Sequence, residues 1–307
     1  MKKLTFTGLA VCSILFAAGC SKVNSATKLM DTGAVSKTVT FSVFEQPGDE
    51  GAAPPDLKKQ IVFSDLNEWK LTESKKDQDR ILTAVRFLPA GSVRATDYTL
   101  EAGPGMKVIV SSTATKVSDD QIDYVETWKW SGKLKDDTSP GKDLKPILKA
   151  DLAAFNPTDE QVDRGIIQMR NTLFKAIFGP GDPLMMTFFS NPEGASRKLH
   201  VVMTNALLSF MKTEFPNATD AERLKAARVI AKKLSDDTSK QTTVSPENPP
   251  KEDNSSMTSV LVTVEGPGEL ISSNGEYDIV DNTVFWQMFS DACMYEPVVL
   301  KASFKLK

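Results

Sequence analysis

Two hydrophobic periodicities occupy different parts of this 307-residue chain. In Thr38–Glu45, Val39, Phe41 and Val43 alternate with threonine and serine, which predicts a half-buried β-strand, and residues 257–307 show further strand patterns. The middle of the chain repeats its apolar residues every three or four positions, which predicts amphipathic helices. Because the two kinds of pattern are segregated, we expect an α+β fold. Its antiparallel sheet or sandwich would combine N- and C-terminal strands, with three helices as an insertion or layer.

Runs rich in β-branched and aromatic residues mark the other strands. Asn274-Gly275 lies between two of them and is typical of a hairpin turn. The last strand would leave an aggregation-prone edge if unpaired, so we expect the C-terminal strands to pair with the N-terminal ones. The expected strands are Gln60–Phe63, Thr83–Leu88, Met106–Ser111, Asp123–Trp130, Met257–Glu265, Glu269–Ser273, Glu276–Val280, Thr283–Phe289 and Val298–Leu306.

Capping signals place the starts of three helices. Thr158–Gln161 and Thr219–Glu222 both have the spacing of a capping box, in which the first and fourth residues satisfy each other's backbone N–H groups. The helix between them is expected to start at Asn191, with Pro192 at its first position, and to reach about Phe215.

The N-terminus has the layout of a secretory signal. Lys2 and Lys3 precede an apolar stretch, and Ala17-Ala18-Gly19-Cys20 ends it. These residues resemble the lipobox of bacterial lipoproteins, although leucine is the commonest residue where Ala17 stands. The resemblance implies removal of residues 1–19 and acylation of Cys20, which would hold the chain at a membrane because several acyl chains anchor stably. The residue after the lipobox cysteine is Ser21, whereas an aspartate at this position retains lipoproteins at the inner membrane. The resemblance therefore implies sorting to the outer membrane if the cell is Gram-negative.

Composition shifts divide the chain further. We expect a signal peptide at 1–19, a lipidated tether at 20–37, an N-terminal β region at 38–132 and a helical region at 133–235. Residues 236–256 contain almost no aliphatic side chains and are expected to form a disordered linker or loop. Residues 257–307 form the C-terminal β region, in one domain with the N-terminal strands.

Charge and cysteine content exclude several functions. The chain has 37 basic and 40 acidic residues, so it lacks the electrostatic footprint of a nucleic-acid-binding protein. Once the signal is removed and Cys20 is acylated, only Cys293 remains free, so no intrachain disulfide is expected. One histidine and one free cysteine cannot build the usual zinc sites, and we expect no metal or other cofactor.

The search for catalytic residues gives weak candidates. Cys293 and His200 could form a nucleophile–base pair, but neither lies in a nucleophile motif, and a buried structural cysteine is the preferred interpretation. Asp119, Asp120 and Asp123 lack the spacing of a calcium loop and are interpreted as a solvated turn. Paired carboxylates for glycoside hydrolysis remain open, because such pairs are distant in sequence.

The segment Pro183–Pro192 contains the most concentrated apolar run outside the signal. We expect this run to belong to the core, and the alternative is a flexible contact surface for a lipid or partner. Its large apolar residues are Leu184, Met185, Met186, Phe188 and Phe189.

Pro267–Trp286 resembles a pattern in LppM-type lipoproteins. Pro267-Gly268 precedes a strand, Asn274-Gly275 forms a turn, and Asn282-Thr-Val-Phe-Trp286 begins another strand. Asp281 replaces the usual glycine. The resemblance implies a lipoprotein β domain in contact with lipid or envelope glycolipid, without implying particular binding residues.

The sequence therefore predicts a membrane-anchored envelope lipoprotein that binds an envelope component or has a structural role. The alternatives are an envelope hydrolase that uses unidentified carboxylates, and a carrier of lipid or glycolipid. A deep pocket with two converging carboxylates would favour the enzyme, and a long apolar cavity would favour the carrier.

Overall fold

A computed structural model describes residues 21–44, 56–90, 96–103, 105–132, 144–181, 183–184, 187, 190–241 and 258–306. The chain divides into two compact units. The first, here called the sandwich, contains the described parts of 21–132 and 258–306 together with residues 178–181. The second, the helical unit, contains 144–177 and the described parts of 183–241.

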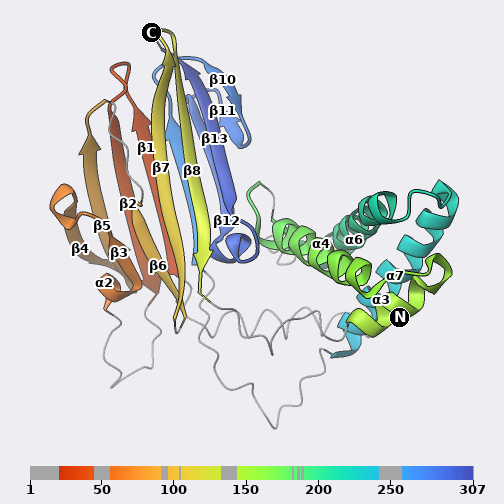
Figure 1. The fold of residues 1–307 in the computed structure, drawn as a ribbon. Coiled ribbons are helices and arrows are strands. Elements are labelled where there is room, and N and C mark those ends of the chain that lie inside the picture. Colours follow the sequence, from red (N-terminus) through yellow and green to blue (C-terminus); the bar gives the residue numbers. More distant parts are fainter. Residues whose placement is uncertain are drawn as a thin grey trace, which may run out of the picture. The chain divides into compact units, whose positions relative to one another are not determined.

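Within the described residues, the strands of the sandwich form a seven-stranded and a six-stranded sheet (Figure 1). The first sheet has the order β11 (Glu276–Asp278), β12 (Thr283–Phe289), β9 (Thr258–Glu265), β1 (Ser21–Leu29), β2 (Val35–Phe44), β5 (Asp79–Leu88) and β4 (Lys70–Lys76). The second has the order β10 (Leu270–Ser273), β13 (Val298–Lys305), β8 (Gln121–Ser131), β7 (Met106–Ser118), β6 (Tyr98–Gly103) and β3 (Ile61–Phe63). Short helical turns connect them at α2 (Leu57–Gln60), η1 (Leu66–Glu68) and η4 (Ser290–Cys293).

The C-terminal strands pair with N-terminal strands in both sheets, as expected. β13 is antiparallel to β8, with Val298 opposite Trp128 and Lys305 opposite Gln121. β9 lies beside β1 in the other sheet, and this pair is parallel, with Ser21 opposite Thr258. The first sheet is therefore mixed, which differs from the wholly antiparallel arrangement that we expected.

The expected tether at 20–37 is wrong for its described part, because Ser21–Leu29 form β1 and Val35 begins β2. Alternate residues of β1 are buried, starting with Ser21 itself. The hydroxyl of Ser21 shares a 2.7 Å hydrogen bond with the hydroxyl of Thr258. Ser21 is therefore already part of the sandwich.

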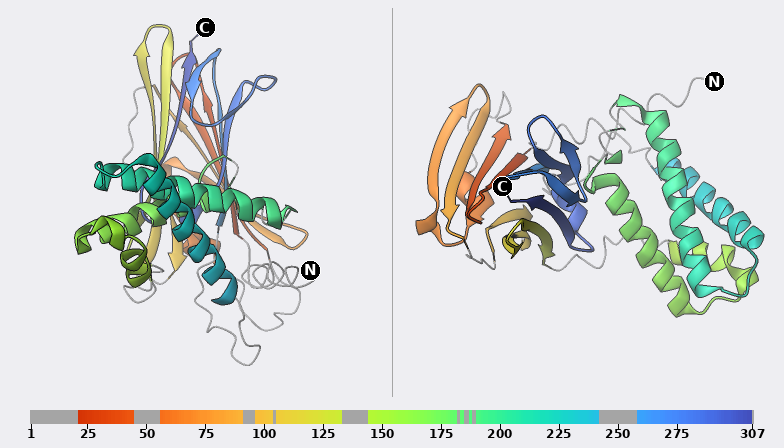
Figure 2. Two further views of the ribbon diagram at one scale, coloured as in Figure 1. Left: turned by 90° about the vertical axis from the view of Figure 1, so that its right-hand side faces the viewer. Right: turned by 90° about the horizontal axis from the view of Figure 1, so that it is seen from above.

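The inner faces of the two sheets enclose one hydrophobic core. The right-hand view of Figure 2 looks along the strands and shows the two sheets facing each other. Alternation explains the burial: every second side chain of β2 and of β8 points inward. Trp128 of β8 and Trp286 of β12 are the largest buried side chains. The sandwich expected from the alternating patterns is thus present, and its strands come from both ends of the chain.

Asn274-Gly275 does not form the expected hairpin, because β10 and β11 belong to different sheets. The Asn274 side chain instead ties the sheets together. Its Oδ1 accepts hydrogen bonds from the Trp286 indole at 3.0 Å and from the Lys301 backbone N–H at 2.8 Å. A Cβ at Gly275 would lie 2.5 Å from the Trp286 ring, so the close passage of the chain requires glycine.

The helical unit is built on the expected capping signals. Thr158 and Gln161 satisfy each other's backbone N–H groups at 3.0 and 3.2 Å, and Thr219 and Glu222 do the same at 2.8 and 3.3 Å. The Asn191 side chain caps the middle helix by accepting from the Gly194 N–H. The described elements are α3 (Leu144–Asp151), η3 (Ala153–Phe155), α4 (Asp159–Phe178), α6 (Pro192–Glu214) and α7 (Asp220–Gln241).

The helical unit has a hydrophobic core of its own, to which α3, α4, α6 and α7 all contribute. α7 continues to Gln241, so residues 236–241 of the expected linker are helical, and residues 242–256 lie outside the described residues. Among the helices that the structure describes, none combines the length and the hydropathy needed to span a bilayer.

Candidate functional site

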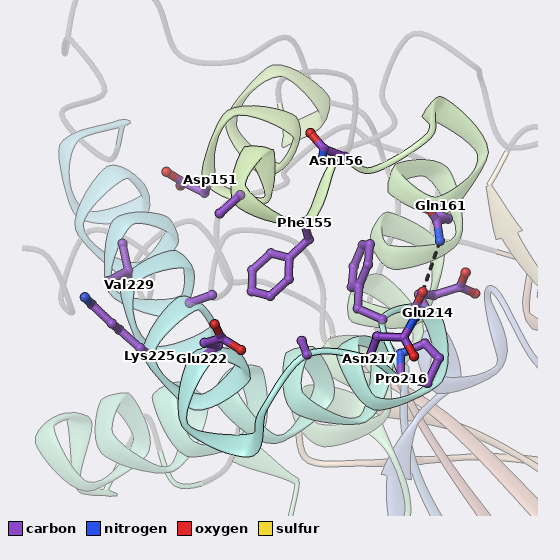
Figure 3. A pocket seen from close by; sticks show the side chains of 14 residues that line it. Asp151, Phe155, Asn156, Gln161, Glu214, Pro216, Asn217, Glu222, Lys225 and Val229 are labelled. Carbon is purple, nitrogen blue, oxygen red and sulfur yellow. Dashed lines mark hydrogen bonds between the residues drawn. The ribbon is translucent and has the colours of Figure 1, made fainter.

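A depression of about 760 Å³ opens on the helical unit, within the size range of small-molecule sites (Figure 3). Its walls come from the end of α3, from η3, from the first turn of α4, from the α6–α7 turn and from the first turns of α7. The lining residues are Asp151, Ala154, Phe155, Asn156, Gln161, Glu214, Phe215, Pro216, Asn217, Ala218, Glu222, Lys225, Ala226 and Val229.

Aromatic packing shapes the floor of the depression. The rings of Phe155 and Phe215 lie 5.3 Å apart between centroids, and Phe210 meets Phe215 edge-on at 5.9 Å. Phe215 is buried, whereas Phe155 is only partly buried and stands in the middle of the view in Figure 3. Val229 of α7 also lines the depression and is 45% exposed. The depression thus offers an apolar surface that a ligand could cover.

Three carboxylates line the depression, and each is engaged by another group. Asp151 pairs with Lys233. Glu214 accepts two hydrogen bonds from Arg164, at 2.7 and 2.8 Å, and these bonds lower the pKa of Glu214. Glu222 caps α7, and its bonds from the Thr219 N–H and hydroxyl lower its pKa. A general acid at neutral pH needs a raised carboxyl pKa, which is the opposite shift. The lining therefore suits binding better than acid–base catalysis.

A second polar feature, the ionic layer, lies between the two sheets of the sandwich. Lys37 of β2 and Arg86 of β5 point inward from one sheet, and Asp97 and Glu126 point inward from the other. The Lys37 ammonium donates to Asp97 at 2.8 Å and to Glu126 at 2.7 Å. Arg86 pairs with the other oxygen of Asp97. The four charges sum to zero, and all four side chains are almost completely buried.

Neutral donors complete the ionic layer. Tyr124 donates to Glu126 at 2.5 Å, and the Trp128 indole donates to its other oxygen at 2.8 Å. Ser112 donates to Asp97. The Arg86 guanidinium lies 4.5 Å from the centre of the Trp69 ring, in a cation–π arrangement. Buried charges persist only when they are paired and hydrogen-bonded. Each of the four charges has a partner of opposite sign, and among the described residues only Nε and Nη1 of Arg86 in this layer have no hydrogen-bond acceptor.

The electrostatics of the ionic layer keep its ions charged. Burial by itself would lower the pKa of Lys37, but the Asp97 and Glu126 carboxylates outweigh burial and hold that pKa well above its usual value. Burial would likewise raise the pKa of Asp97, but Lys37 and Arg86 lower it. The four charged side chains are almost completely buried among the described residues, so we assign the ionic layer a structural role.

Sequence reasoning missed the ionic layer although a signal was present. Lys37 occupies a buried position in the alternation of β2, between Val35 and Val39. Glu126 occupies the same kind of position in β8, beside Tyr124 and Trp128. A charged residue on an apolar face predicts a buried partner of opposite charge. The partners come from the other sheet, which the sequence alone does not bring into register.

Of the five predicted contact residues, Leu184 lies within the described residues. It is buried, which agrees with the preferred core interpretation for that residue. Cys20, Met185, Met186, Phe188 and Phe189 lie outside the described residues, so acylation of Cys20 and the role of the apolar run stay predictions.

The remaining chemical candidates are placed clearly. Cys293 is buried in η4, and burial raises its thiol pKa to about 12, so the reactive thiolate is scarce at neutral pH. His200 lies on α6 of the helical unit. Asp120 accepts from the Ser118 hydroxyl, and Asp123 accepts from Gln121 and Ser303. Within the described ranges, no group of three or more His, Cys, Asp or Glu side chains is placed to hold a metal ion.

Comparisons with known proteins identify one distant neighbour. No family model matches the chain. No curated protein matches it. A solved structure with partial similarity is the NMR structure of the folded domain of LppM from Mycobacterium tuberculosis, with 9% sequence identity and a TM-score of 0.34. The alignment covers 94% of this chain and 92% of that one.

Proposed function

We propose that this chain is a bacterial envelope lipoprotein, anchored by acyl chains on Cys20, that works by binding and has no catalytic role. The observation that supports the anchor is the place of Ser21 in β1. The lipobox-like sequence ends at Cys20, and Ser21 is already a buried, hydrogen-bonded strand residue. The expected cleavage point therefore lies directly beside a residue of the sandwich.

The early start of β1 also changes the expected geometry at the membrane. A tether of 17 residues would have let the folded part reach roughly 20–25 Å from the bilayer. Because Cys20 is followed directly by Ser21 of β1, the Ser21 end of the sandwich would lie against the lipid headgroups. In a Gram-negative cell, the serine after Cys20 favours the outer membrane as the site of anchoring.

Mass spectrometry of the membrane fraction tests the anchor. The wild-type chain should yield an N-terminal peptide that begins at Cys20 and carries a diacylglycerol and a further acyl chain. Cys20→Ser should abolish both the modification and sedimentation with membranes. Cys12→Ser, in the apolar part of the signal, is the matched control and should be processed normally. An unmodified peptide beginning at Met1 would contradict the proposal.

The depression on the helical unit supports a binding role. It combines an apolar floor with three carboxylates that are already held by Arg164, Thr219 and Lys233, which favours binding over hydrolysis by a pair of free carboxylates. Its ligand would be an envelope lipid or an envelope protein segment with an apolar part that covers Phe155 and Val229.

Paired valine variants test the depression. Val229→Asp places a charge in its lining, whereas Val201→Asp places one at an exposed position of α6 outside the lining. Native mass spectrometry of the purified chain mixed with detergent-solubilised envelope extract should show an adduct with the wild type and with Val201→Asp. With Val229→Asp, most of the adduct signal should be lost. Equal binding by the two variants, or no adduct with the wild type, would contradict this use of the depression.

A further inference from the structure

The turn between β11 and β12 exposes two aliphatic side chains. Ile279 is 79% exposed and Val280 is 87% exposed, and both are more exposed than any other large hydrophobic residue that the structure describes. Single exposed apolar residues are ordinary, but two neighbours at the tip of an ordered turn form a patch that is typical of an interaction surface.

Hydrogen bonds hold this turn in one conformation. Asp278 accepts from the Val280 N–H at 2.8 Å, and the Tyr277 hydroxyl donates to the Asn282 side chain at 2.8 Å. The Asn282 amide then donates to the backbone carbonyls of Gly266 and Gly268 at 2.9 and 2.8 Å. The tip is thus ordered before any partner arrives, which reduces the entropic cost of binding.

The turn itself carries only acidic charges, because residues 276–282 contain three acidic residues and no lysine, arginine or histidine. The basic residue in register with the start of β12, Lys28 across β9, is already paired with Glu265. Glu276, Asp278 and Asp281 are exposed on the turn itself. An apolar tip with an acidic collar is complementary to an apolar pocket bordered by lysine or arginine. Anionic lipid headgroups would be repelled by the same collar, so a bilayer is a poor match.

Strand directions place the turn at the far end of the sandwich from Ser21. β1 and β9 are parallel and both start at the Ser21 end, and β12 is antiparallel to β9. The turn that precedes β12 therefore lies at the opposite end, about one strand length or roughly 30 Å away. If Cys20 is anchored as proposed above, the turn faces away from the bilayer.

We propose that the Ile279–Val280 turn is a docking surface for an envelope protein that has an apolar pocket bordered by basic residues. The turn supplies two aliphatic side chains for the pocket, and Glu276 and Asp281 supply the opposite charge for its border. The envelope location of the partner and the orientation of the turn rest on the proposed function, but the docking chemistry does not.

Site-specific photocrosslinking in the producing cells tests the docking surface. The full chain carries p-benzoylphenylalanine in place of Val280 or, as the matched control, in place of Val117, an exposed valine of β7. We expect one discrete protein adduct from position 280 and none from position 117. Mass spectrometry should place the crosslink among apolar residues of the partner that are bordered by lysine or arginine.

Charge variants make the test specific. Glu276→Lys with Asp281→Lys should reduce the adduct at least fivefold, and Glu276→Gln with Asp281→Asn should give an intermediate yield. Unchanged fluorescence and circular dichroism would show that these variants fold. An absent adduct, an adduct with lipid, a yield indifferent to charge reversal, or a partner surface without basic residues would each overturn the proposal.

A vesicle experiment separates a protein partner from a lipid surface. The Cys20→Ser chain with an environment-sensitive fluorophore on Val280→Cys is mixed with vesicles of phosphatidylethanolamine and phosphatidylglycerol. We expect no blue shift, and a blue shift would overturn the proposal in favour of lipid. The N-terminal mass from the same cells shows whether Cys20 is acylated, so failure of the anchor is distinguished from failure of docking.

Discussion

Replacing Lys37 with methionine should destabilise the sandwich strongly. Lys37 is the cation that both Asp97 and Glu126 contact, at 2.8 and 2.7 Å, in a layer without solvent exposure. After the change Asp97 keeps Arg86, but Glu126 keeps only the neutral donors Tyr124 and Trp128. Removing one partner from a buried ion pair costs about 3–5 kcal/mol, because the remaining charge stays buried without compensation.

Urea unfolding followed by tryptophan fluorescence measures this cost directly. The chain has four tryptophans, Trp69, Trp128, Trp130 and Trp286, and all of them lie in the sandwich, so the signal reports on that unit. With a slope of about 2 kcal/mol per molar urea, the expected loss moves the midpoint by roughly 2 M. Domains have about 5–15 kcal/mol of stability, so the variant should still fold at low temperature.

Two further variants separate the ionic layer from general effects of lysine loss. Lys28→Met removes a β1 lysine whose ion pair with Glu265 is exposed, and it should cost under about 1 kcal/mol. Adding Glu126→Gln to Lys37→Met removes the orphaned charge and should recover at least about 1 kcal/mol. The reasoning fails if Lys37→Met is as mild as Lys28→Met, or if the double variant is less stable than the single one.

Three other outcomes are expected. The pKa of Asp97 is lowered, so its contribution to stability is present above its unfolded-state pKa of about 3.9 and is lost as the pH falls through its folded-state value. The pKa of Lys37 is raised, so its contribution to stability is present below its unfolded-state pKa of about 10.4 and is lost as the pH rises through its folded-state value. Urea midpoints measured over a pH series should therefore be constant between the two unfolded-state pKa values. Cys293 should react slowly with iodoacetamide at pH 7, because burial raises its pKa to about 12, and fast alkylation of the native chain would show that the thiol is accessible. Deleting Val298–Lys307 removes the partner of β8 and should abolish the native β signal in circular dichroism, whereas retention of that signal would show that β8 needs no partner.

Local capping patterns predicted the starts of α4, α6 and α7, whereas α3, β1, β4 and β6 were not predicted. The capping residues Thr158, Asn191 and Thr219 mark the helix starts in the structure, because a cap depends on residues only three positions apart. β1 was missed because its inward residues include Ser21, Ser25 and Thr27, which are small and polar. Alternation of hydrophobicity is therefore hidden in that strand, although alternation of burial is complete.

Features that depend on distant residues were not predictable from one sequence. Asn274-Gly275 is typical of a hairpin, but the Asn274 side chain bonds to Trp286 and Lys301 and directs the chain from one sheet to the other. The depression depends on η3 and α7 packing around the Phe155–Phe215 pair, about sixty residues apart, and on the α6–α7 turn. In both cases the tertiary contacts decide the outcome and local propensity does not.

The distance of each sandwich end from the bilayer tests the central claim most directly. Phe44 is 42% exposed at the Ser21 end, since its neighbour Val43 pairs with Ser21, and Val280 lies at the opposite end. Fluorophores on Phe44→Cys and on Val280→Cys are read separately in the acylated chain, in vesicles that contain nitroxide-labelled headgroups. The account predicts strong quenching at position 44 and little at position 280. Equal quenching at both positions, or stronger quenching at position 280, would contradict it.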